Sequence, residues 1–340
     1  MEGACTLLES SGWMGQDQSY RIAAPNTFIS GMLLPVQIER RGEAVQISEQ
    51  CHVCWSDEGR EHDPVCKLVM LHKGRGSTAL RLNAELDIGP RTVRVAVLSV
   101  AEDDAIEKEL ASTLTTGLPA RLPEICDEVV GGVLADEQDL SWPGNAVICV
   151  NSTVRVPFGK ILQVHAGTTI LVSDRADVIV HGILQVLGTL DSPVLWIPMQ
   201  LEPWGGLELR GRDEEALFPN LLLHSWFLGG GGSRATYKQR GHSESQPVVL
   251  VESSGLTMIG GGVTDSPGKA FYARSSVVQS YCTHIARCDT GGEYENSHLH
   301  LEGAVVIEVP NSEWRGLDDD NDGVYLLGKH PTIKGPSAIR

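Results

Sequence analysis

Ile161-Leu162-Gln163-Val164 returns unchanged 22 positions later as Ile183-Leu184-Gln185-Val186. A Gly-Thr step follows each copy, at Gly167-Thr168 and at Gly188-Thr189. A repeat with a period in the low twenties is typical of a solenoid, in which each coil of the chain stacks on the coil before it. Because stacked strands lie about 4.8 Å apart, we expect Gln163 beside Gln185 and Ile161 beside Ile183.

A second repeat extends the pattern toward the C-terminus. Ser253-Ser254-Gly255-Leu256 is answered 22 residues later by Ser275-Ser276-Val277-Val278, and a looser copy begins at Asn296-Ser297-His298-Leu299. From Val147 onward, short alternating segments are punctuated by glycine, with no helical spacing between them, which excludes a βαβ fold. The strands that we predict include 154–156, 161–164, 169–172, 178–180, 183–186, 194–197, 207–209, 248–251, 256–259, 277–279, 298–300, 305–307 and 324–327.

Several segments of this region also carry a family resemblance. They are Val154-Arg155-Val156-Pro157, the run 165–170, the run 182–189 and Trp204-Gly205-Gly206-Leu207. Together they resemble the right-handed parallel β-helix proteins of the pectate-lyase-like superfamily over roughly 145–340. The resemblance implies the fold. It leaves the function open, because that superfamily includes lyases, glycoside hydrolases, adhesins and non-catalytic surface proteins, and no complete catalytic signature is present.

The N-terminal part alternates in a different way. Residues 79–86 and 93–98 place apolar groups at every second position, and Asp87-Ile88-Gly89-Pro90 between them supplies turn residues. This pattern predicts a small immunoglobulin-like or fibronectin-like β-sandwich. Ala101–Leu114 reads as a helix, since acids occupy its first turn and Ile106, Leu110 and Leu114 recur every four residues.

These patterns divide the chain into four parts. We expect an irregular segment over 1–25, a β-sandwich over 26–120, a linker over 121–145 and a right-handed parallel β-helix over 146–340. The all-β chain ends at Ile333–Arg340, just after a strand and without a polar cap. That ending suggests a β-helix truncated at its C-terminus, end-to-end self-association or a larger parent chain.

The charge balance limits the partners. The 340 residues include 44 acidic and 27 basic side chains, for a net charge of −17. Such a surface repels phosphate backbones, so nucleic acid is excluded, whereas cations and neutral glycans fit. No apolar run is long enough to span a bilayer. The N-terminus does not read as a signal peptide, so an extracellular or cell-surface location rests on the resemblance alone.

The eight cysteines leave alternatives open. Cys51-x2-Cys54 with His62 and Cys66 is loosely similar to a zinc knuckle, but buried thiols or a Cys54–Cys66 bridge explain the same residues. Cys282 and Cys288 are close, and Cys5, Cys126 and Cys149 stand alone. One N-glycosylation sequon, Asn151-Ser152-Thr153, matters only on a secretory route.

The sharpest chemical motif is Asp318-Asp319-Asp320-Asn321-Asp322-Gly323. Its D-x-D-x-D-G pattern predicts a calcium loop with Asp318, Asp320 and Asp322 as ligands. The sequence does not match a full EF-hand loop, because position twelve of that loop would be Lys329 and not Glu. The alternatives are a solvated acidic turn or catalytic carboxylates, with Asp319 among them. We expect no organic cofactor.

A step of 22 to 26 residues back from this motif reaches Glu293, Glu295 and Asn296, with Asp289 close by. If the coils stack at that spacing, these acids add calcium ligands or form a catalytic pair for glycoside hydrolysis. The catalytic candidates are therefore Asp289, Glu293, Glu295 and Asp319.

The segment 229–242 interrupts the coil rhythm with glycines followed by basic residues. Insertions of this kind often line the binding face of a solenoid. Substrate-binding candidates are Arg234, Tyr237, Lys238, Arg240 and His242. An anionic sugar would suit them, and Arg240 could act as the base of a β-elimination; a mobile surface loop is the alternative. Of Trp196, Trp204, Trp226 and Trp314, we expect most to be buried and keep Trp314 as a sugar-stacking candidate.

Three functions follow. The first is a non-catalytic surface or matrix β-helix protein that binds glycans, with calcium as a candidate stabilising ion. The second is a polysaccharide lyase or glycoside hydrolase acting on uronate-containing glycans. The third is a structural or adhesive module of a larger protein.

Overall fold

The computed structural model describes backbone and side chains over residues 126–134, 140–189, 192–200, 202–211, 220–231, 246–281, 283–302 and 323–328. Elsewhere it gives the backbone of separate strands. The chain forms two compact units, each taken by itself below. One comprises Thr6–Leu122 with Leu190–Ser192, and the other comprises Met1–Cys5, Pro123–Thr189 and Pro193–Arg340.

The unit over Thr6–Leu122 contains two antiparallel sheets. One sheet has the order β1-β2-β5 and the other β4-β3-β6-β7. The strands are β1 (Tyr20–Ala23), β2 (Leu33–Arg40), β3 (Glu49–Asp57), β4 (Val65–Leu71), β5 (Arg75–Arg81), β6 (Arg91–Val100) and β7 (Ile106–Thr116). The antiparallel strands agree with the predicted alternation. How the two sheets pack lies outside the description, so the sandwich stays a prediction.

The predicted helix over Ala101–Leu114 is wrong. Residues 106–116 form β7, which pairs with β6 in antiparallel register. The apolar residues Ile106, Leu110 and Leu114 recur every four positions, and a spacing of four also satisfies the two-residue period of a strand. The acidic residues at the start of this segment were therefore not evidence for the first turn of a helix.

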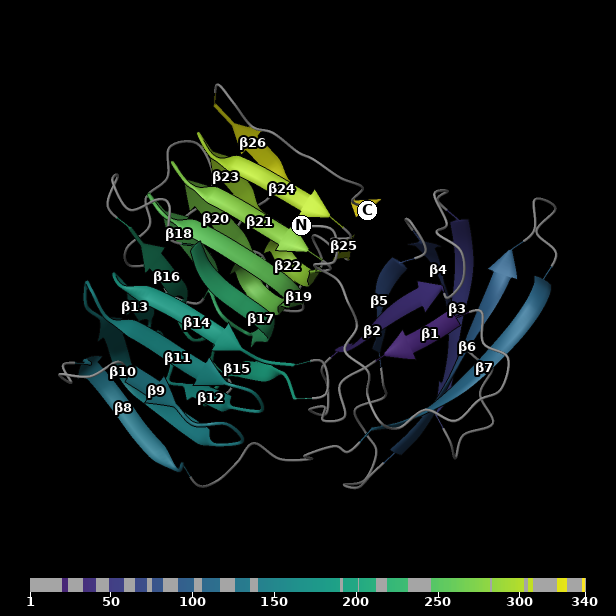
Figure 1. The fold of residues 1–340 in the computed structure, drawn as a ribbon, viewed down its shortest axis with the longest axis horizontal. Coiled ribbons are helices and arrows are strands. Elements are labelled where there is room, and N and C mark those ends of the chain that lie inside the picture. Colours follow the sequence, from purple (N-terminus) through teal and green to yellow (C-terminus); the bar gives the residue numbers. More distant parts are fainter. Residues whose placement is uncertain are drawn as a thin grey trace. The chain divides into compact units, whose positions relative to one another are not determined.

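The second unit is an all-parallel solenoid whose strands repeat in three hydrogen-bonded ladders (Figure 1). Ladder 1 contains β9 (Leu140–Trp142), β11 (Ile161–His165), β14 (Ile183–Leu187), the first part of β17 (Pro219–Leu228), the first part of β19 (Gly255–Lys269), β21 (Val277–Tyr281) and β24 (His298–Glu302).

The other two ladders contain the remaining strands. Ladder 2 contains the first parts of β8 (Glu128–Val133) and β10 (Val147–Val156), then β12 (Thr169–Val172), β15 (Val194–Pro198), the later parts of β17 and β19, β22 (His284–Thr290), β25 (Val305–Ile307) and β27 (Ala338–Ile339). Ladder 3 contains the later parts of β8 and β10, then β13 (Val178–Val180), β16 (Leu207–Arg210), β18 (Val249–Glu252), β20 (Phe271–Arg274), β23 (Glu293–Glu295) and β26 (Tyr325–Leu327).

The repeats predicted from the sequence set the register of ladder 1. Ile161 pairs with Ile183 and Gln163 with Gln185. The second repeat is confirmed as well, because Leu256 pairs with Val278 and Val278 with Leu299. The solenoid starts earlier than predicted, since β8 and β9 are rungs inside the segment 121–145 that we assigned to a linker. That segment contains glycine and many acids, which masked its short strands.

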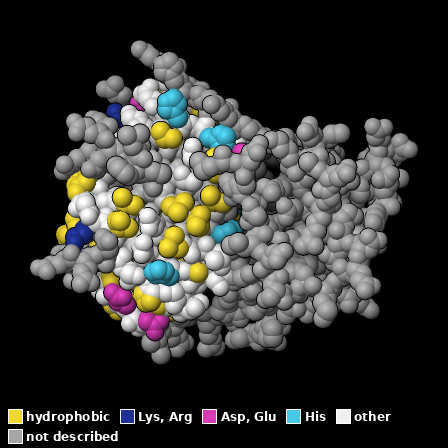
Figure 2. Space-filling view, in the orientation of Figure 1, with side chains coloured by type: hydrophobic (Ala, Val, Ile, Leu, Met, Phe, Trp, Pro, Cys, Tyr) yellow, Lys and Arg dark blue, Asp and Glu magenta, His cyan; other side chains and the backbone are white. Residues whose placement is uncertain are grey.

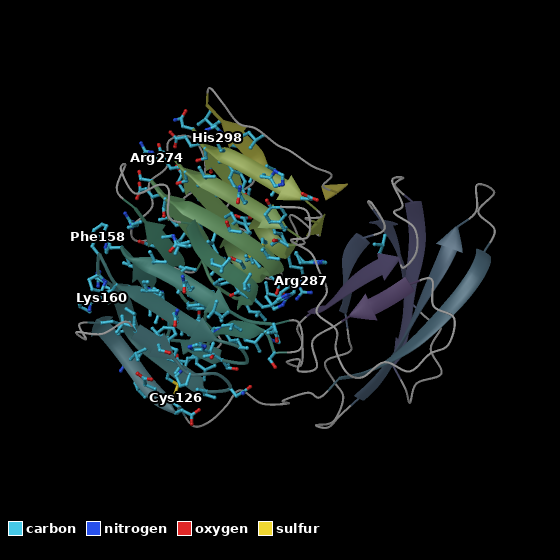
Figure 3. All side chains as sticks on the ribbon, viewed as in Figure 1. Cys126, Phe158, Lys160, Arg274, Arg287 and His298 are labelled. Atoms are coloured by element: carbon cyan, nitrogen blue, oxygen red, sulfur yellow. A yellow bond between two sulfur atoms is a disulfide. The ribbon has the colours of Figure 1, made fainter. Side chains whose placement is uncertain are left out.

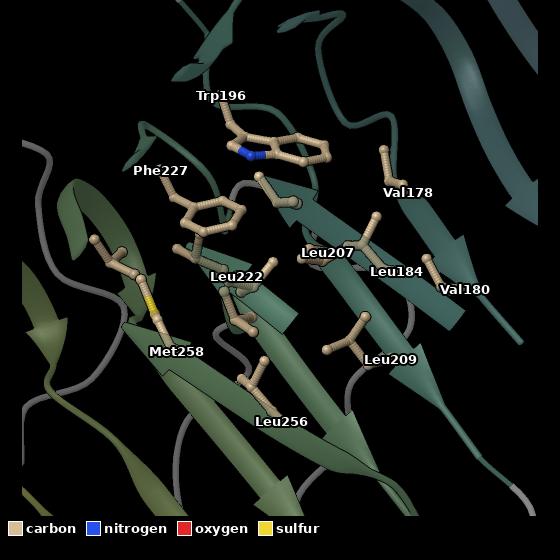
Figure 4. Close-up of a cluster of buried hydrophobic side chains, with 14 of the residues drawn as sticks. Val178, Val180, Leu184, Trp196, Leu207, Leu209, Leu222, Phe227, Leu256 and Met258 are labelled. Atoms are coloured by element: carbon tan, nitrogen blue, oxygen red, sulfur yellow. The ribbon is translucent and has the colours of Figure 1, made fainter. Parts of the chain in front are cut away.

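Alternate residues of every ladder point into one continuous core. Leu162 and Val164 of β11, and Leu184 and Val186 of β14, are fully buried. Figure 4 shows how the ladders meet: Trp196 and Phe227 of ladder 2 lie over aliphatic side chains of ladders 1 and 3. The rings of Trp196 and Phe227 stack with centroids 5.4 Å apart. Each fully buried large apolar side chain contributes about 1.5–3 kcal/mol relative to an exposed one.

A serine ladder closes the corner between ladder 3 and ladder 1. The hydroxyl of Ser276 accepts a hydrogen bond from the Ser254 amide at 3.3 Å, and the hydroxyl of Ser297 accepts one from the Ser276 amide at 3.1 Å. Ser253, Ser275 and Asn296, one residue earlier on each rung, all have positive φ near 50°. The repeated Ser-Ser step thus supplies one turn residue and one buried acceptor per coil.

The serine ladder predicts unequal effects for two neighbouring serines. Ser276→Ala removes the acceptor of a buried amide and should lower the free energy of unfolding by about 1–3 kcal/mol. Ser275→Ala changes an exposed side chain at the same turn and should stay within about 0.5 kcal/mol of the wild type. Urea unfolding followed by tryptophan fluorescence measures both. Equal midpoints for the two variants would contradict the role of the ladder.

Candidate binding face and acidic corner

The outward side chains of ladder 1, which we call the front face, form a nearly uncharged surface (Figure 2). They are half-buried or exposed except Tyr281, which is 8% exposed. Among the described outward positions from Ser141 to Glu302, Glu302 is the one acidic residue, and there is no lysine or arginine. The front face consists of Ser141, Ile161, Gln163, His165, Ile183, Gln185, Leu187, Leu221, Leu223, Thr257, Ile259, Val277, Gln279, Tyr281, His298, His300 and Glu302. One acidic residue and no lysine or arginine among these positions is fewer charged groups than the 21% charged composition of the chain would give.

Polar side chains occupy most of the middle row of the front face, which Leu221 interrupts between Gln185 and Thr257. Gln163 donates a hydrogen bond from Nε2 to Oε1 of Gln185 at 2.9 Å. Thr257 donates from Oγ1 to Oε1 of Gln279 at 3.4 Å. Aliphatic residues flank much of this row, with His165, Tyr281, His298 and Glu302 at its two ends. The face therefore offers polar groups and apolar groups at the spacing of the rungs, about 4.8 Å.

The C-terminal end of the front face is aromatic and contains its acid. The rings of Tyr281 and His300 have centroids 5.1 Å apart, and His300 Nε2 lies 3.4 Å from Glu302 Oε2. Burial of the hydroxyl, and secondly the charge of Glu302, raise the pKa of Tyr281 above its ordinary value. Tyr281 is therefore a neutral hydrogen-bonding group at physiological pH.

His224 occupies the corner between ladders 1 and 2 beside the front face. It has a φ of 43°, and a side chain on Gly260 of the next rung would collide with its ring. Gly260 itself has a φ of 67°, so glycine satisfies both the turn and the close approach. Burial lowers the pKa of His224 to about 4, because the charged imidazolium would lose its hydration.

The depressed pKa of His224 predicts an acid-sensitive corner. Its stabilising contribution is complete above the unfolded pKa near 6.5 and is lost as the pH falls through about 4. His224→Asn keeps a residue that tolerates positive φ and removes the titration. Melting temperatures between pH 7 and pH 4 should fall less steeply in the variant than in the wild type. Parallel curves would show that His224 does not titrate in this way.

The second candidate site is the corner between ladder 2 and ladder 3, which we call the acidic corner. The connections β17–β18, β22–β23 and β25–β26 all cross it. Most residues predicted as functional belong to these connections. Arg234, Tyr237, Lys238, Arg240 and His242 follow β17, and Trp314, Asp318, Asp319, Asp320 and Asp322 follow β25; all ten lie outside the described residues.

Two predicted catalytic acids are described at this corner, and both are buried. Asp289 is 0% exposed and Glu293 is 5% exposed. Lys269 Nζ, itself 1% exposed, lies 2.5 Å from Glu293 Oε2. Glu293 is thus held by a buried ion pair with Lys269. Within the described part of the chain, no three His, Cys, Asp or Glu side chains converge as metal ligands.

The predicted spacing between the acidic motif and Glu293 is wrong. Glu293 pairs with Tyr325 and Glu295 with Leu327, so this coil advances by 32 residues and not by 22 to 26. The long β25–β26 connection, residues 308–324, lengthens the coil. The motif therefore comes earlier in the chain than Tyr325 and Leu327, which are the residues that pair with these two acids.

The remaining predicted residues have ordinary structural partners. Glu295 accepts a hydrogen bond from the Tyr272 hydroxyl at 2.8 Å and lies 3.9 Å from the Arg274 guanidinium. The expectation of buried tryptophans is confirmed for Trp196, Trp204 and Trp226, which are 0%, 0% and 6% exposed.

Sequence reasoning missed a hydrogen-bonded carboxylate and a disulfide. Asp177 Oδ1 accepts bonds from Gln246 Nε2 at 2.7 Å and from the Gly206 amide at 3.0 Å, across residues distant in sequence. Cys126 and Cys149, which we took as isolated, form a disulfide. Their separation of 23 residues is close to one coil, which was the available signal.

The cysteine-rich segment of the N-terminal unit is described by its backbone alone. Cys54 lies directly opposite Cys66 on the neighbouring strand, and Cys51 lies opposite Val69. This register suits a Cys54–Cys66 bridge, while the zinc alternative stays a prediction, since His62 lies outside the described residues.

Comparisons of the chain with protein families, with curated proteins and with solved structures gave no match. In the described part of the chain, no helix has the length and apolar character needed to cross a membrane.

The buried pair predicts a large penalty for removing one partner. Lys269→Met leaves the Glu293 carboxylate uncompensated in the interior and should lower the free energy of unfolding by about 3–5 kcal/mol. The double variant Lys269→Met/Glu293→Leu should lose less than the sum of the two single changes. Arg175→Met is the matched control, because its ion pair with Asp174 is 3.6 Å long and exposed, and should cost at most about 1 kcal/mol. Additive single changes would refute the coupling.

Proposed function

We propose that this protein is a non-catalytic binding β-helix that holds an elongated, uncharged glycan along the front face. The ligand class is a neutral polysaccharide chain. We further propose that the solenoid is a right-handed parallel β-helix of the pectate-lyase-like kind, and that the N-terminal sheets form an immunoglobulin-like or fibronectin-like sandwich. The expected location is extracellular or at a cell surface.

The neutrality of the front face carries this proposal. A chain with 17 excess acidic charges leaves one long surface with a single described acid and no described lysine or arginine. The groups on that surface, amides, hydroxyls and aliphatic side chains, are those that pair with sugar hydroxyls and with the apolar face of a sugar ring. Because the rungs repeat at about 4.8 Å, an extended sugar chain would meet a further set of polar and apolar groups on each successive rung.

The state of the described acids supports binding without turnover. A glycoside hydrolase needs two carboxyl groups that reach the scissile bond from solvent. Glu293 instead forms a buried pair with Lys269, and Asp289 is buried. Glu295 bonds the Tyr272 hydroxyl on the neighbouring rung. These contacts favour structural roles for all three carboxylates.

A single observation favours an enzyme as the second candidate. The connection with the predicted basic residues and the connection with the predicted acidic motif cross the same acidic corner. A polysaccharide lyase acting on uronates would combine such groups, with calcium held by Asp318, Asp320 and Asp322. The third candidate, an adhesive module of a larger protein, would also use the front face.

A charge inserted into the front face tests the leading proposal. Gln185→Glu keeps the oxygen that accepts the bond from Gln163 and adds one negative charge. A neutral polysaccharide that covers this position must desolvate the carboxylate, which costs about 1–3 kcal/mol, so the Kd should rise by about 5- to 150-fold. Gln200→Glu adds the same charge at an exposed position outside the front face and should leave the Kd unchanged.

The measurement is a screen of neutral and uronate-containing polysaccharides, with and without calcium, followed by Kd determination for the three proteins. Ultraviolet absorbance of the same mixtures reports unsaturated uronates. Equal Kd values for Gln185→Glu and Gln200→Glu, or no bound polysaccharide in the screen, would refute the front-face proposal. Growing absorbance would favour the lyase.

A further inference from the structure

The sequon Asn151-Ser152-Thr153 lies at a corner of the solenoid where the chain bulges outward. On one side, β8 pairs Val130 with Val150 and Gly132 with Val154, so that a single residue, Gly131, opposes the three residues of the sequon. An added residue pair on one strand forces the strand to bend away from its partner. Asn151 and Ser152 are accordingly exposed, in the middle of a strand in which Val150 and Val154 are buried.

The preceding rung leaves room for the sequon side chains. A Cβ atom at Gly131 would lie 2.3 Å from Ser152 Oγ and 2.5 Å from Asn151 Oδ1. Glycine at this position therefore leaves space for the ends of these two side chains, which would have to move if the residue had a Cβ atom. Thr153 is held in place, since its Oγ1 accepts a hydrogen bond from the Asp177 amide at 3.2 Å. The corner thus fixes the third residue of the sequon and projects the first two into solvent.

A second observation bears on the compartment. Cys149, two residues before Asn151 on β10, forms the disulfide with Cys126 of the first rung, and their Cα atoms are 5.7 Å apart. Figure 3 shows Cys126 at the end of the solenoid opposite His298. Disulfides of this structural kind form and persist in oxidising compartments, and N-linked glycans are added on the same secretory route.

We propose that Asn151 is an N-glycosylation site. The donor is an oligosaccharide linked to a lipid diphosphate, which a transferase of the secretory route supplies. Nδ2 of Asn151 loses a proton and forms a bond to C1 of the first sugar. The bond from C1 to the diphosphate oxygen breaks, and the lipid diphosphate leaves with the electron pair. The inference is independent of the front face and of any activity at the acidic corner.

The sequence makes the test clean, because Asn151 is the one asparagine in the 340 residues that begins an Asn-x-Ser/Thr triplet. The full chain is expressed behind a secretory leader in a eukaryotic host, and retained and secreted protein are both collected. Treatment with a peptide N-glycosidase should remove the mass of one oligosaccharide. Peptide mass spectrometry should then find aspartate at position 151.

Three variants test whether the sequon itself, and not the surrounding surface, determines glycosylation. Asn151→Gln and Thr153→Ala should each abolish the mass loss. Ser152→Ala alters the neighbouring exposed side chain but keeps the Asn-x-Thr pattern, so it should retain the glycan. Alkylation before and after reduction should find Cys126 and Cys149 protected until the reductant is added. Unmodified Asn151 in most of the collected wild-type chain, or two free thiols in the secreted chain, would overturn the proposal.

Discussion

The lateral register between rungs is the constraint on which the rest of the solenoid depends. Each strand of ladders 1, 2 and 3 satisfies its backbone donors and acceptors through the strand one coil away, and a rung on its own has no such partner. Register also decides orientation, since a slip by one residue would turn Leu162 and Val164 outward and place Gln163 in the core. The serine ladder at one corner and the stacked Trp196 and Phe227 rings in the core reinforce the same alignment.

The solenoid could be predicted because short motifs of adjacent residues recur at a fixed spacing in the sequence. Two copies of Ile-Leu-Gln-Val and three copies of a serine step specify which positions pair, and the structure pairs them. The N-terminal unit was harder to predict, because no local repeat specifies which of its strands pair. The residues Ile106, Leu110 and Leu114 satisfy both the helical and the strand period, and only the partner strand β6 decides between them.

The candidate sites were less predictable, because a coil tolerates insertions of any length at one corner. Strands of ladder 3 stay in register although the connections before them differ widely, so a spacing taken from one coil fails on the next. That is why the acidic motif could not be aligned with Glu293, whose partner is Tyr325. The hydrogen bond between Asp177 and Gln246, 69 residues away, has no local signal at all. The alternating pattern of the sequence indicates which side chains of a strand share a face. The low charge of the whole front face can be recognised only after the register of the rungs is known.

The N-terminal end of the solenoid shows how an open ladder is kept from pairing further. In the described residues β8 pairs with β10 and has no strand on its other side, and Val129 and Val133 are each 59% exposed. Edge strands invite association unless something interrupts them. Here Gly131 and Gly132 break the register, and the disulfide from Cys126 holds the first rung to the second. A glycan on Asn151 would stand at the bulge above those glycines and add bulk beside the edge. The glycine that faces the sequon, Gly131, therefore also belongs to the interruption in the register of this edge strand.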